Sequence, residues 1–317
     1  MRKPVPASQN QGCTQARPIQ GAAAIALSRL PIAAFALLAG FVQTSAARAA
    51  DSASSAPPVP AATLSHSDLA YSDLAYSDLV DLAEAAPVVV RAQVRQVTAL
   101  DAAHASPLRG RARVYVEART EALLAGRGAV GETLRYLADV PADTRGRPLS
   151  LKKRSVLLFA RIVPDRVGEL QLAAPDGQVL WDPALETRVR GVLAELLAAG
   201  APPKILRVRE ALYVPGNLTG EGETQMSLTT QSGTPVSLTV VHRPGAVPRW
   251  GLSLGEIVDE AAVPPQPGTL TWYRLACTLA PQLPVAANVS ASASDRALAE
   301  ADYGFVRTAL GPCGRTR

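Results

Sequence analysis

The sequence predicts a mainly β protein of the α+β class, in which a small antiparallel barrel is followed by a helix and a second β-rich half that ends in a helix. Segments with a hydrophobic residue at every second position recur along the chain after residue 87, as they do in half-buried strands. Clusters of glycine, proline and charged residues separate these segments. The 317 residues are 48% hydrophobic and 19% charged, so the chain is able to bury a core.

The barrel is predicted from six strands that follow one another closely. In the first of them, Val90 and Val94 face the core while Arg91 and Arg95 face solvent. No long helix separates the strands, and short strands at this spacing typically form a closed or nearly closed antiparallel barrel. The six predicted strands are residues 88–95, 111–121, 133–140, 155–163, 169–174 and 178–181.

The pattern of residues 88–182 resembles that of secreted netrin-like and tissue-inhibitor-like barrels of the OB type. The likeness lies in the successive segments VVVRAQV, VYVEARTEALLAG, TLRYLADV and SVLLFA. It implies an OB-like barrel. Inhibitors of that kind use an N-terminal cluster of cysteines, which this part of the chain lacks, so protease inhibition is not implied.

Two helices are expected to flank the barrel. The first covers residues 77–86, with Ser77 as its N-cap and Pro87 ending it. The second begins at Asp182-Pro183, an N-cap acid followed by proline at the first helical position. Its apolar residues recur at helical spacing, and Glu186 and Arg190 form an i, i+4 pair on another face.

The second β-rich half is expected to end in a helix over residues 295–310. Its predicted apolar stripe includes Leu298, Phe305 and Val306. The predicted strands that precede this helix are residues 204–214, 223–230, 235–242 and 269–277.

Residues 1–49 have the layout of a secretory signal peptide. A run of 13 apolar residues, 30–42, follows a basic stretch, and Ala47-Arg48-Ala49 places small residues where signal peptidase needs them. Cleavage after Ala49 leaves 317 − 49 = 268 residues. A helix of 13 residues is about 20 Å long, short of the roughly 30 Å hydrocarbon core. A cleaved signal is therefore favoured over the alternative, a retained anchor, and we expect no stable membrane span after cleavage.

Four segments are expected along the chain. Residues 1–49 are the signal peptide, and residues 50–76 are a flexible linker that holds tandem Ser-Asp-Leu repeats. Residues 77–200 form the OB-like barrel domain with its flanking helices. Residues 201–317 form a β-rich C-terminal domain with the terminal helix.

The charge distribution argues against nucleic-acid binding. The net charge is +5, but residues 1–49 contain five basic residues and no acidic one, which leaves 32 − 5 = 27 basic against 27 acidic residues elsewhere. A phosphate-binding surface would need its basic excess in the folded part. The folded part is rich in arginine and poor in lysine, a bias typical of GC-rich bacterial genes, so we expect a periplasmic or secreted bacterial protein.

Cys277 and Cys313 are the cysteines left after signal cleavage. Two thiols in an oxidising compartment usually pair, so the sequence predicts a disulfide between them. Two cysteines and the scattered His66, His104 and His242 match no spacing known for metal ligands. We therefore expect no metal site and no cofactor.

Residues 215–225 form the densest polar cluster, between two predicted strands. Its three glycines would let the backbone approach a ligand, and Glu221 and Glu223 would serve as paired carboxylates for acid–base chemistry. The candidate binding residues are Asn217, Glu221, Glu223 and Trp250, the last as part of an aromatic contact surface. The alternative is an ordinary turn between strands, with the tryptophan in the core.

No catalytic motif occurs in the sequence, so we expect a non-enzymatic exported protein that binds another envelope protein or peptide, or takes part in envelope assembly. The first alternative is a metal-independent hydrolase that uses the loop carboxylates of residues 216–225. The second is a structural subunit that associates with copies of itself.

Overall fold

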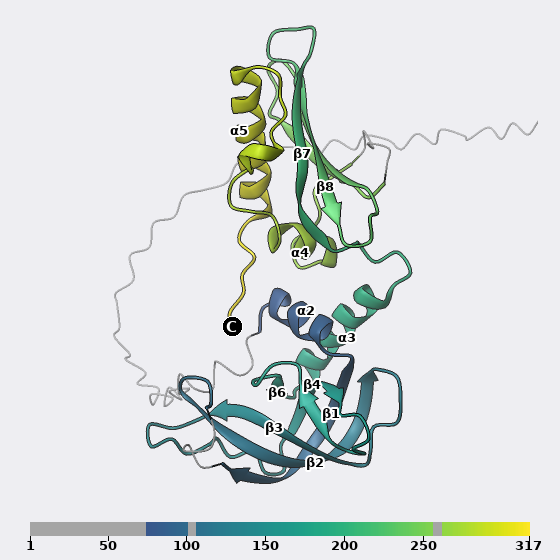
Figure 1. Ribbon diagram of the computed structural model, residues 1–317, viewed down its shortest axis with the longest axis vertical. Coiled ribbons are helices and arrows are strands. Elements are labelled where there is room, and N and C mark those ends of the chain that lie inside the picture. The colour runs from purple at the N-terminus through teal and green to yellow at the C-terminus, as the bar shows by residue number, and fades with distance from the viewer. Residues whose placement is uncertain (1–73, 101–105, 256–261) are drawn as a thin grey trace, which may run out of the picture. The chain divides into compact units, whose positions relative to one another are not determined.

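The computed structural model describes residues 74–100, 106–255 and 262–317 (Figure 1). These residues form two antiparallel sheets and a few helices, which confirms a β-rich α+β protein. The predicted signal peptide and nearly all of the predicted linker lie outside the described residues.

The first sheet contains the six strands predicted from the alternating pattern. Its strands run in the order β3-β2-β1-β4-β5, and β6 also pairs with β4. The strands are β1 (Val88–Ala99), β2 (Arg111–Ala125), β3 (Thr133–Pro141), β4 (Ser155–Ile162), β5 (Leu170–Leu172) and β6 (Gln178–Leu180).

The first sheet is buried on both faces along β1 and β4. One face contributes Val90, Val156 and Leu158 to an apolar cluster shared with β2 and β3. The opposite face contributes Val89 and Phe159 to a second cluster, in which the helices take part. A strand buried on both faces has a continuous apolar sequence, which explains the run SVLLFA in β4.

The two ends of this sheet approach one another without forming a closed barrel. Arg135 in β3 and Glu169, just before β5, form an isolated parallel bridge. Its hydrogen bond runs from the backbone N–H of Arg135 to the carbonyl oxygen of Gly168, at 2.8 Å. A strand ladder between β3 and β5 is absent from the described residues.

Helices α2 (Tyr76–Ala85) and α3 (Pro183–Leu197) pack beside β1 and β4 (Figure 1). The predicted cap of α3 is confirmed, since the Asp182 carboxylate accepts a 2.8 Å hydrogen bond from the N–H of Leu185. The predicted cap of α2 is wrong. Ser77 lies within the helix, and the Asp78 carboxylate instead accepts a 3.0 Å bond from the N–H of Ala75.

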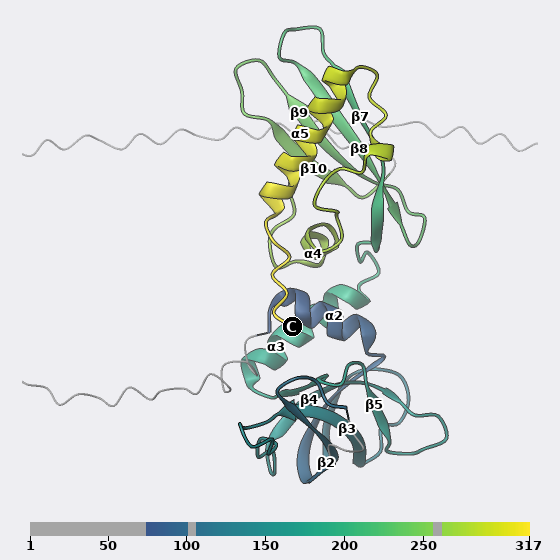
Figure 2. The same ribbon diagram turned by 60° about the vertical axis from the view of Figure 1, so that its left-hand side comes forward.

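The second sheet has the strand order β10-β9-β8-β7. Helix α5 (Ala293–Leu310) crosses it and contacts β7 and β8 (Figure 2). The apolar cluster between α5 and the sheet includes Ala299, Tyr303 and Val306 of the helix. The strands are β7 (Ile205–Pro215), β8 (Gly222–Thr230), β9 (Val236–His242) and β10 (Arg249–Ser253).

The strand predicted over residues 269–277 is wrong, because this segment forms helix α4 (Leu270–Ala276). Thr269 is its N-cap and accepts a 3.3 Å hydrogen bond from the N–H of Trp272. Threonine and aromatic residues favour strands, but six of the seven residues of this helix are buried. Burial on all sides removes the periodicity that distinguishes a helix from a strand.

The predicted disulfide between Cys277 and Cys313 is present, and it joins the end of α4 to the residues that follow α5. It closes a loop of 36 positions. Over the described ranges, no helix is long and apolar enough to cross a bilayer. Both findings are consistent with an extracellular or periplasmic location.

Candidate functional site

The predicted binding loop is the hairpin connection between β7 and β8. The carboxylate of Glu221 accepts hydrogen bonds from the backbone N–H groups of Asn217 at 3.1 Å and Leu218 at 3.2 Å. The Glu221 carbonyl accepts a further bond from the N–H of Gly216 at 2.9 Å. Glu221 therefore holds the hairpin turn together with both its side chain and its backbone.

Glu223 and Trp250 lie on opposite faces of the second sheet. Glu223 is partly exposed on β8 and accepts a 2.9 Å hydrogen bond from the side-chain amide of Gln225. Trp250 lies on β10, pairs with Val240 and is 7% exposed in the apolar core. The structure thus does not bring the loop residues and Trp250 together around one cavity.

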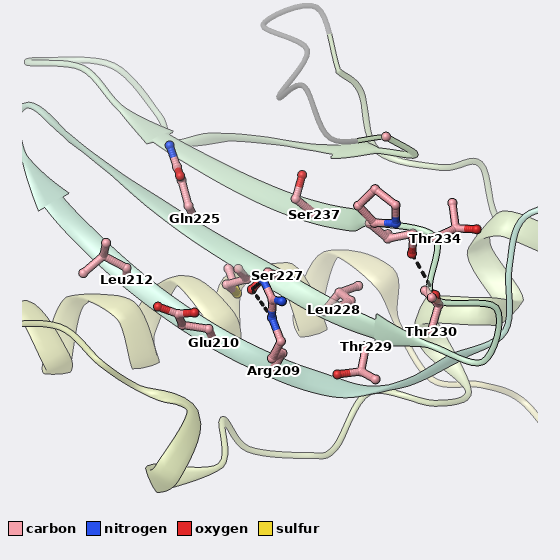
Figure 3. Close-up of a pocket in the computed structure, with 15 residues that line it drawn as sticks. Arg209, Glu210, Leu212, Gln225, Ser227, Leu228, Thr229, Thr230, Thr234 and Ser237 are labelled. Atoms are coloured by element: carbon pink, nitrogen blue, oxygen red, sulfur yellow. Dashed lines mark hydrogen bonds between the residues drawn. The ribbon is translucent and has the colours of Figure 1, made fainter. Parts of the chain in front are cut away.

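A groove of about 570 Å³ lies on the second sheet, and sequence reasoning missed it (Figure 3). The helices of the C-terminal part run behind the sheet in this view, while Gln225 and Ser237 project from the strands in front. The alternation along β8 explains this, because Met226 and Leu228 are buried toward α5 while Gln225 and Ser227 face the other way.

The lining of the groove comes from residues placed opposite one another across the strands. One row runs through Leu212, Gln225, Thr239 and Gly251, and the next through Glu210, Ser227, Ser237 and Ser253. The side chains of Leu212, Gln225, Glu210, Ser227 and Ser237 line the groove itself.

The groove offers hydrogen-bonding groups and two charges of opposite sign. Among the described residues, the guanidinium of Arg209 donates to the hydroxyl of Ser227 alone, at 3.3 and 3.4 Å. Neither Arg209 nor Glu210 forms an ion pair with any residue that the structure describes. The side-chain amide of Gln225 and the hydroxyl of Ser237 also line the groove. These groups are able to bind a polar ligand, because hydroxyls and amides both donate and accept.

A second polar cluster fixes α5 to the sheet. Asp302 is 4% exposed; its carboxylate accepts from the Thr224 hydroxyl and lies 2.7 Å from Nε2 of His242. The ring of Tyr213 packs edge-on to that of His242, with centroids 6.3 Å apart. Burial, followed by the negative charges of Asp302 and Asp295, raises the pKa of Tyr213.

A polar residue on the buried stripe of α5 was the signal for this cluster. Asp302 lies at i+3 from Ala299 and precedes Tyr303, both of them core residues. Buried carboxylates are rarely left unpaired, so such a position predicts a partner on the sheet. The sequence alone does not say that the partner is His242, which is 60 positions away.

No group of three or more His, Cys, Asp or Glu side chains in the described part of the chain is arranged to hold a metal ion. No protein-family model matches the chain, and no curated protein matches it in sequence. The function is therefore inferred from the geometry of the described residues.

Proposed function

We propose that this protein is an exported, non-enzymatic binding module of the bacterial envelope, periplasmic or secreted, that binds an extended segment of another envelope protein in the groove of the second sheet. The observation behind this proposal is the groove itself. It is open, and its lining combines apolar residues such as Leu212 and Val236 with hydroxyl, amide and charged side chains. Of the charged side chains, Arg209 and Glu210 have no ionic partner among the described residues.

An extended peptide suits this lining for two reasons. Each peptide unit presents one N–H donor and one C=O acceptor, and Ser227, Ser237 and Gln225 offer both functions in return. The charged side chains of Arg209 and Glu210 would then select charged residues of the segment. A volume of about 570 Å³ lies within the range typical of ligand-binding clefts.

The loop carboxylates are used in a way that favours binding over catalysis. Glu221 accepts two backbone N–H groups of its own turn, and Glu223 bonds to Gln225. A general base must be free to reach the proton that it removes. The Glu221 carboxylate is bonded within its own turn, so its role is structural.

We also propose that the first sheet is an OB-like barrel. Two features support this. Strand β1 pairs with both β2 and β4, and the β3 and β5 ends meet in parallel at Arg135 and Glu169. OB barrels are small, five-stranded and partly open. The resemblance of residues 88–182 to netrin-like domains points the same way.

Site-specific photo-crosslinking tests the peptide-binding groove. A photoreactive amino acid is placed at Ser227 or Ser237 in the groove, and at Ser294 as a matched control. Ser294 is an exposed serine on α5, outside the groove. Irradiation of cells, purification and mass spectrometry should give one discrete protein adduct from the two groove positions and none from the control.

Three results would contradict the proposal. The groove positions give no adduct, or the control gives the same adduct, or the crosslinked molecule is a glycan or lipid and not a polypeptide. As a second variant, Ser227→Trp should fill the groove from a partly exposed position. It should abolish the adduct at position 237 while the far-ultraviolet circular dichroism stays unchanged.

A metal-independent hydrolase is the second candidate, and one observation favours it. His242 pairs across the sheet with Gly222 and is held by Asp302, so an oriented imidazole lies at the start of β8, on the face opposite to Glu223. Replacing both glutamates by glutamine, or His242 by alanine, separates the two candidates. If a substrate screen finds activity, its loss in a folded variant would favour the hydrolase.

A further inference from the structure

A second groove, independent of the one in Figure 3, lies on the first sheet where β3 faces β5. Its volume is about 730 Å³. Its lining includes four arginines and two carboxylates, so its charge is 4 − 2 = +2. The arginines are Arg113, Arg135, Arg161 and Arg166, and the carboxylates are Asp139 and Glu169.

The groove follows a seam that is joined at both ends and open between them. At one end the N–H of Arg135 donates to the carbonyl of Gly168 at 2.8 Å, and at the other the N–H of Asp139 donates to the carbonyl of Pro175 at 2.7 Å. No strand pairing joins β3 to β5 between these points within the described ranges. From residue 135 to 139 the strand advances about 13 Å at 3.3 Å per residue.

The four arginines differ in how fully their charge is neutralised. Arg113 is held by Asp139 through two bonds of 2.7 and 3.0 Å. Arg166 pairs with Glu169 at 3.1 Å, but its side chain is 66% exposed. Arg161 is exposed, at the end of β4, and has no carboxylate partner in the part of the chain that the structure describes.

Arg135 also has its charge only partly neutralised. Its guanidinium lies 3.5 Å from Glu117, and the two side chains are 51% and 36% exposed. Exposed ion pairs are weak and exchange readily. The groove therefore contains one unpaired cation and two that are loosely paired.

An exposed apolar residue lies in the middle of the same seam. Leu137 is 49% exposed, and it lies between Arg135 and Asp139 on the outward face of β3. Tyr115 of β2, its partner in the ladder, lines the groove beside it. An apolar contact surrounded by guanidinium groups fits a segment that carries both apolar and acidic side chains.

We propose that this seam is a docking site for an extended acidic segment of a partner protein, about four to five residues long where it contacts the groove. Strand β3 runs extended along the seam between the bonded N–H groups of Arg135 and Asp139, so a segment that lies beside it would also be extended, as strands added to sheets are. The guanidinium groups of Arg161, Arg135 and Arg166 select carboxylates, with which arginine forms bidentate pairs. Leu137 and Tyr115 contact the apolar side chains of the segment.

Fluorescence anisotropy with the purified exported chain tests this site. The probe is a labelled ten-residue peptide of alternating glutamate and valine, compared with peptides in which lysine or serine replaces glutamate. Only the acidic peptide should bind, and its binding should weaken steeply between 50 mM and 500 mM salt, because screening shortens the reach of charges. Equal binding of the serine peptide would overturn the proposal.

Charge reversal at Arg161 identifies the site. Arg161→Glu should weaken binding of the acidic peptide roughly tenfold. The control Arg95→Glu should leave it within about twofold, because Arg95 is exposed on β1 of the same sheet, outside the groove. Equal effects of the two variants would show a nonspecific charge effect and overturn the proposal.

Competition with inorganic phosphate distinguishes a peptide site from a small-anion site. Displacement of the acidic peptide only at the ionic strength that sodium chloride also requires supports the peptide site. Displacement by phosphate at far lower concentration than chloride would overturn it. The crosslinking test at Ser227 and Ser237 probes the groove of the second sheet. The proposal for that groove and the proposal for the seam can therefore be refuted independently.

Discussion

Glu186 lies where three structural elements of the barrel region meet, and Glu186→Gln should destabilise the fold. Its Oε2 atom accepts from the indole N–H of Trp181 at 2.5 Å and from Arg91 at 2.8 Å. Its Oε1 atom accepts two bonds from Arg190, at 2.7 and 2.9 Å. These partners come from β1, from α3 itself and from the residue that follows β6.

The expected loss in unfolding free energy is about 2–4 kcal/mol at pH 7. A hydrogen bond to a charged group contributes about 1.5–3 kcal/mol. The side chains of Arg91 and Arg190 are 28% and 54% exposed, so water screens them and reduces their contribution. Glutamine retains one acceptor oxygen, so part of the hydrogen-bond network remains. Its NH₂ group, however, would face the N–H donors that the second carboxylate oxygen now accepts from.

The effect should depend on pH. Burial raises the pKa of Glu186, but hydrogen bonds from Trp181, Arg190 and Arg91 outweigh it and hold the pKa below its ordinary value. In the unfolded chain, a glutamate carboxyl has a pKa of about 4.3. The stabilisation is therefore fully present above that pH and is lost as the pH falls through the lower pKa of the folded state.

Urea denaturation of wild type and variant, followed by circular dichroism, measures both effects. The stability difference should be largest at pH 7 and should shrink below about pH 4. Glu300→Gln, at an exposed position of α5, is the control and should change stability by less than about 0.5 kcal/mol. A loss for Glu186→Gln no larger than the control's, or one equal at pH 7 and pH 3, would refute the reasoning.

Three further predictions concern the rest of the chain. Replacing Cys277 and Cys313 by serine should lower the free energy of unfolding by about 4 kcal/mol, because the disulfide closes a loop of 36 positions and so reduces the entropy of the unfolded chain. The urea midpoint of this variant should match that of the reduced wild type. A midpoint equal to that of the oxidised wild type would contradict the prediction. Gly222→Ala should cost about 1–3 kcal/mol, because its Cβ would overlap the ring of Tyr213; thermal melting measures it. Mass spectrometry of the exported protein should find an N-terminus directly after Ala49, whereas a full-length chain would indicate a retained anchor.

The strands of the first sheet could be predicted from the sequence because the pattern of buried and exposed residues within each strand is visible in its own sequence. In β1, Val90, Ala92 and Val94 are fully buried and Arg95 is exposed, so the alternation is visible without knowing what lies opposite. The cap of α3 was equally local, because Asp182 satisfies an N–H only three residues away.

Elements buried by distant neighbours could not be placed so well. The predicted stripe of α5 included Leu298, which is 39% exposed, whereas Ala299 and Tyr303 are buried. A shift of one residue rotates a helix face by about 100°, and small residues such as alanine give little signal. In α4, burial of Trp272 and Leu275 by the surrounding residues outweighed their ambiguous local pattern.

The grooves could not be predicted for a related reason. Each depends on the register between strands, and a bulge between Val208 and Glu210 shifts the pairing of β7 with β8. That shift places Glu210 opposite Ser227, which no local pattern reveals. The glycine-rich loop of residues 215–225 was predicted as a binding site, but the carboxylate of Glu221 is bonded within its own turn.

If both proposed grooves bind a segment, the protein would act as an adaptor and not as a carrier of a single ligand. The groove near Ser227 has one positive and one negative side chain, whereas the seam near Arg161 has an excess of two positive charges. Lining groups this different select different segments, since specificity depends on unfavourable pairings as well as favourable ones. If one partner bound both, Arg161→Glu would weaken the crosslink at Ser237 as well. If two partners bind, each variant should remove one and retain the other.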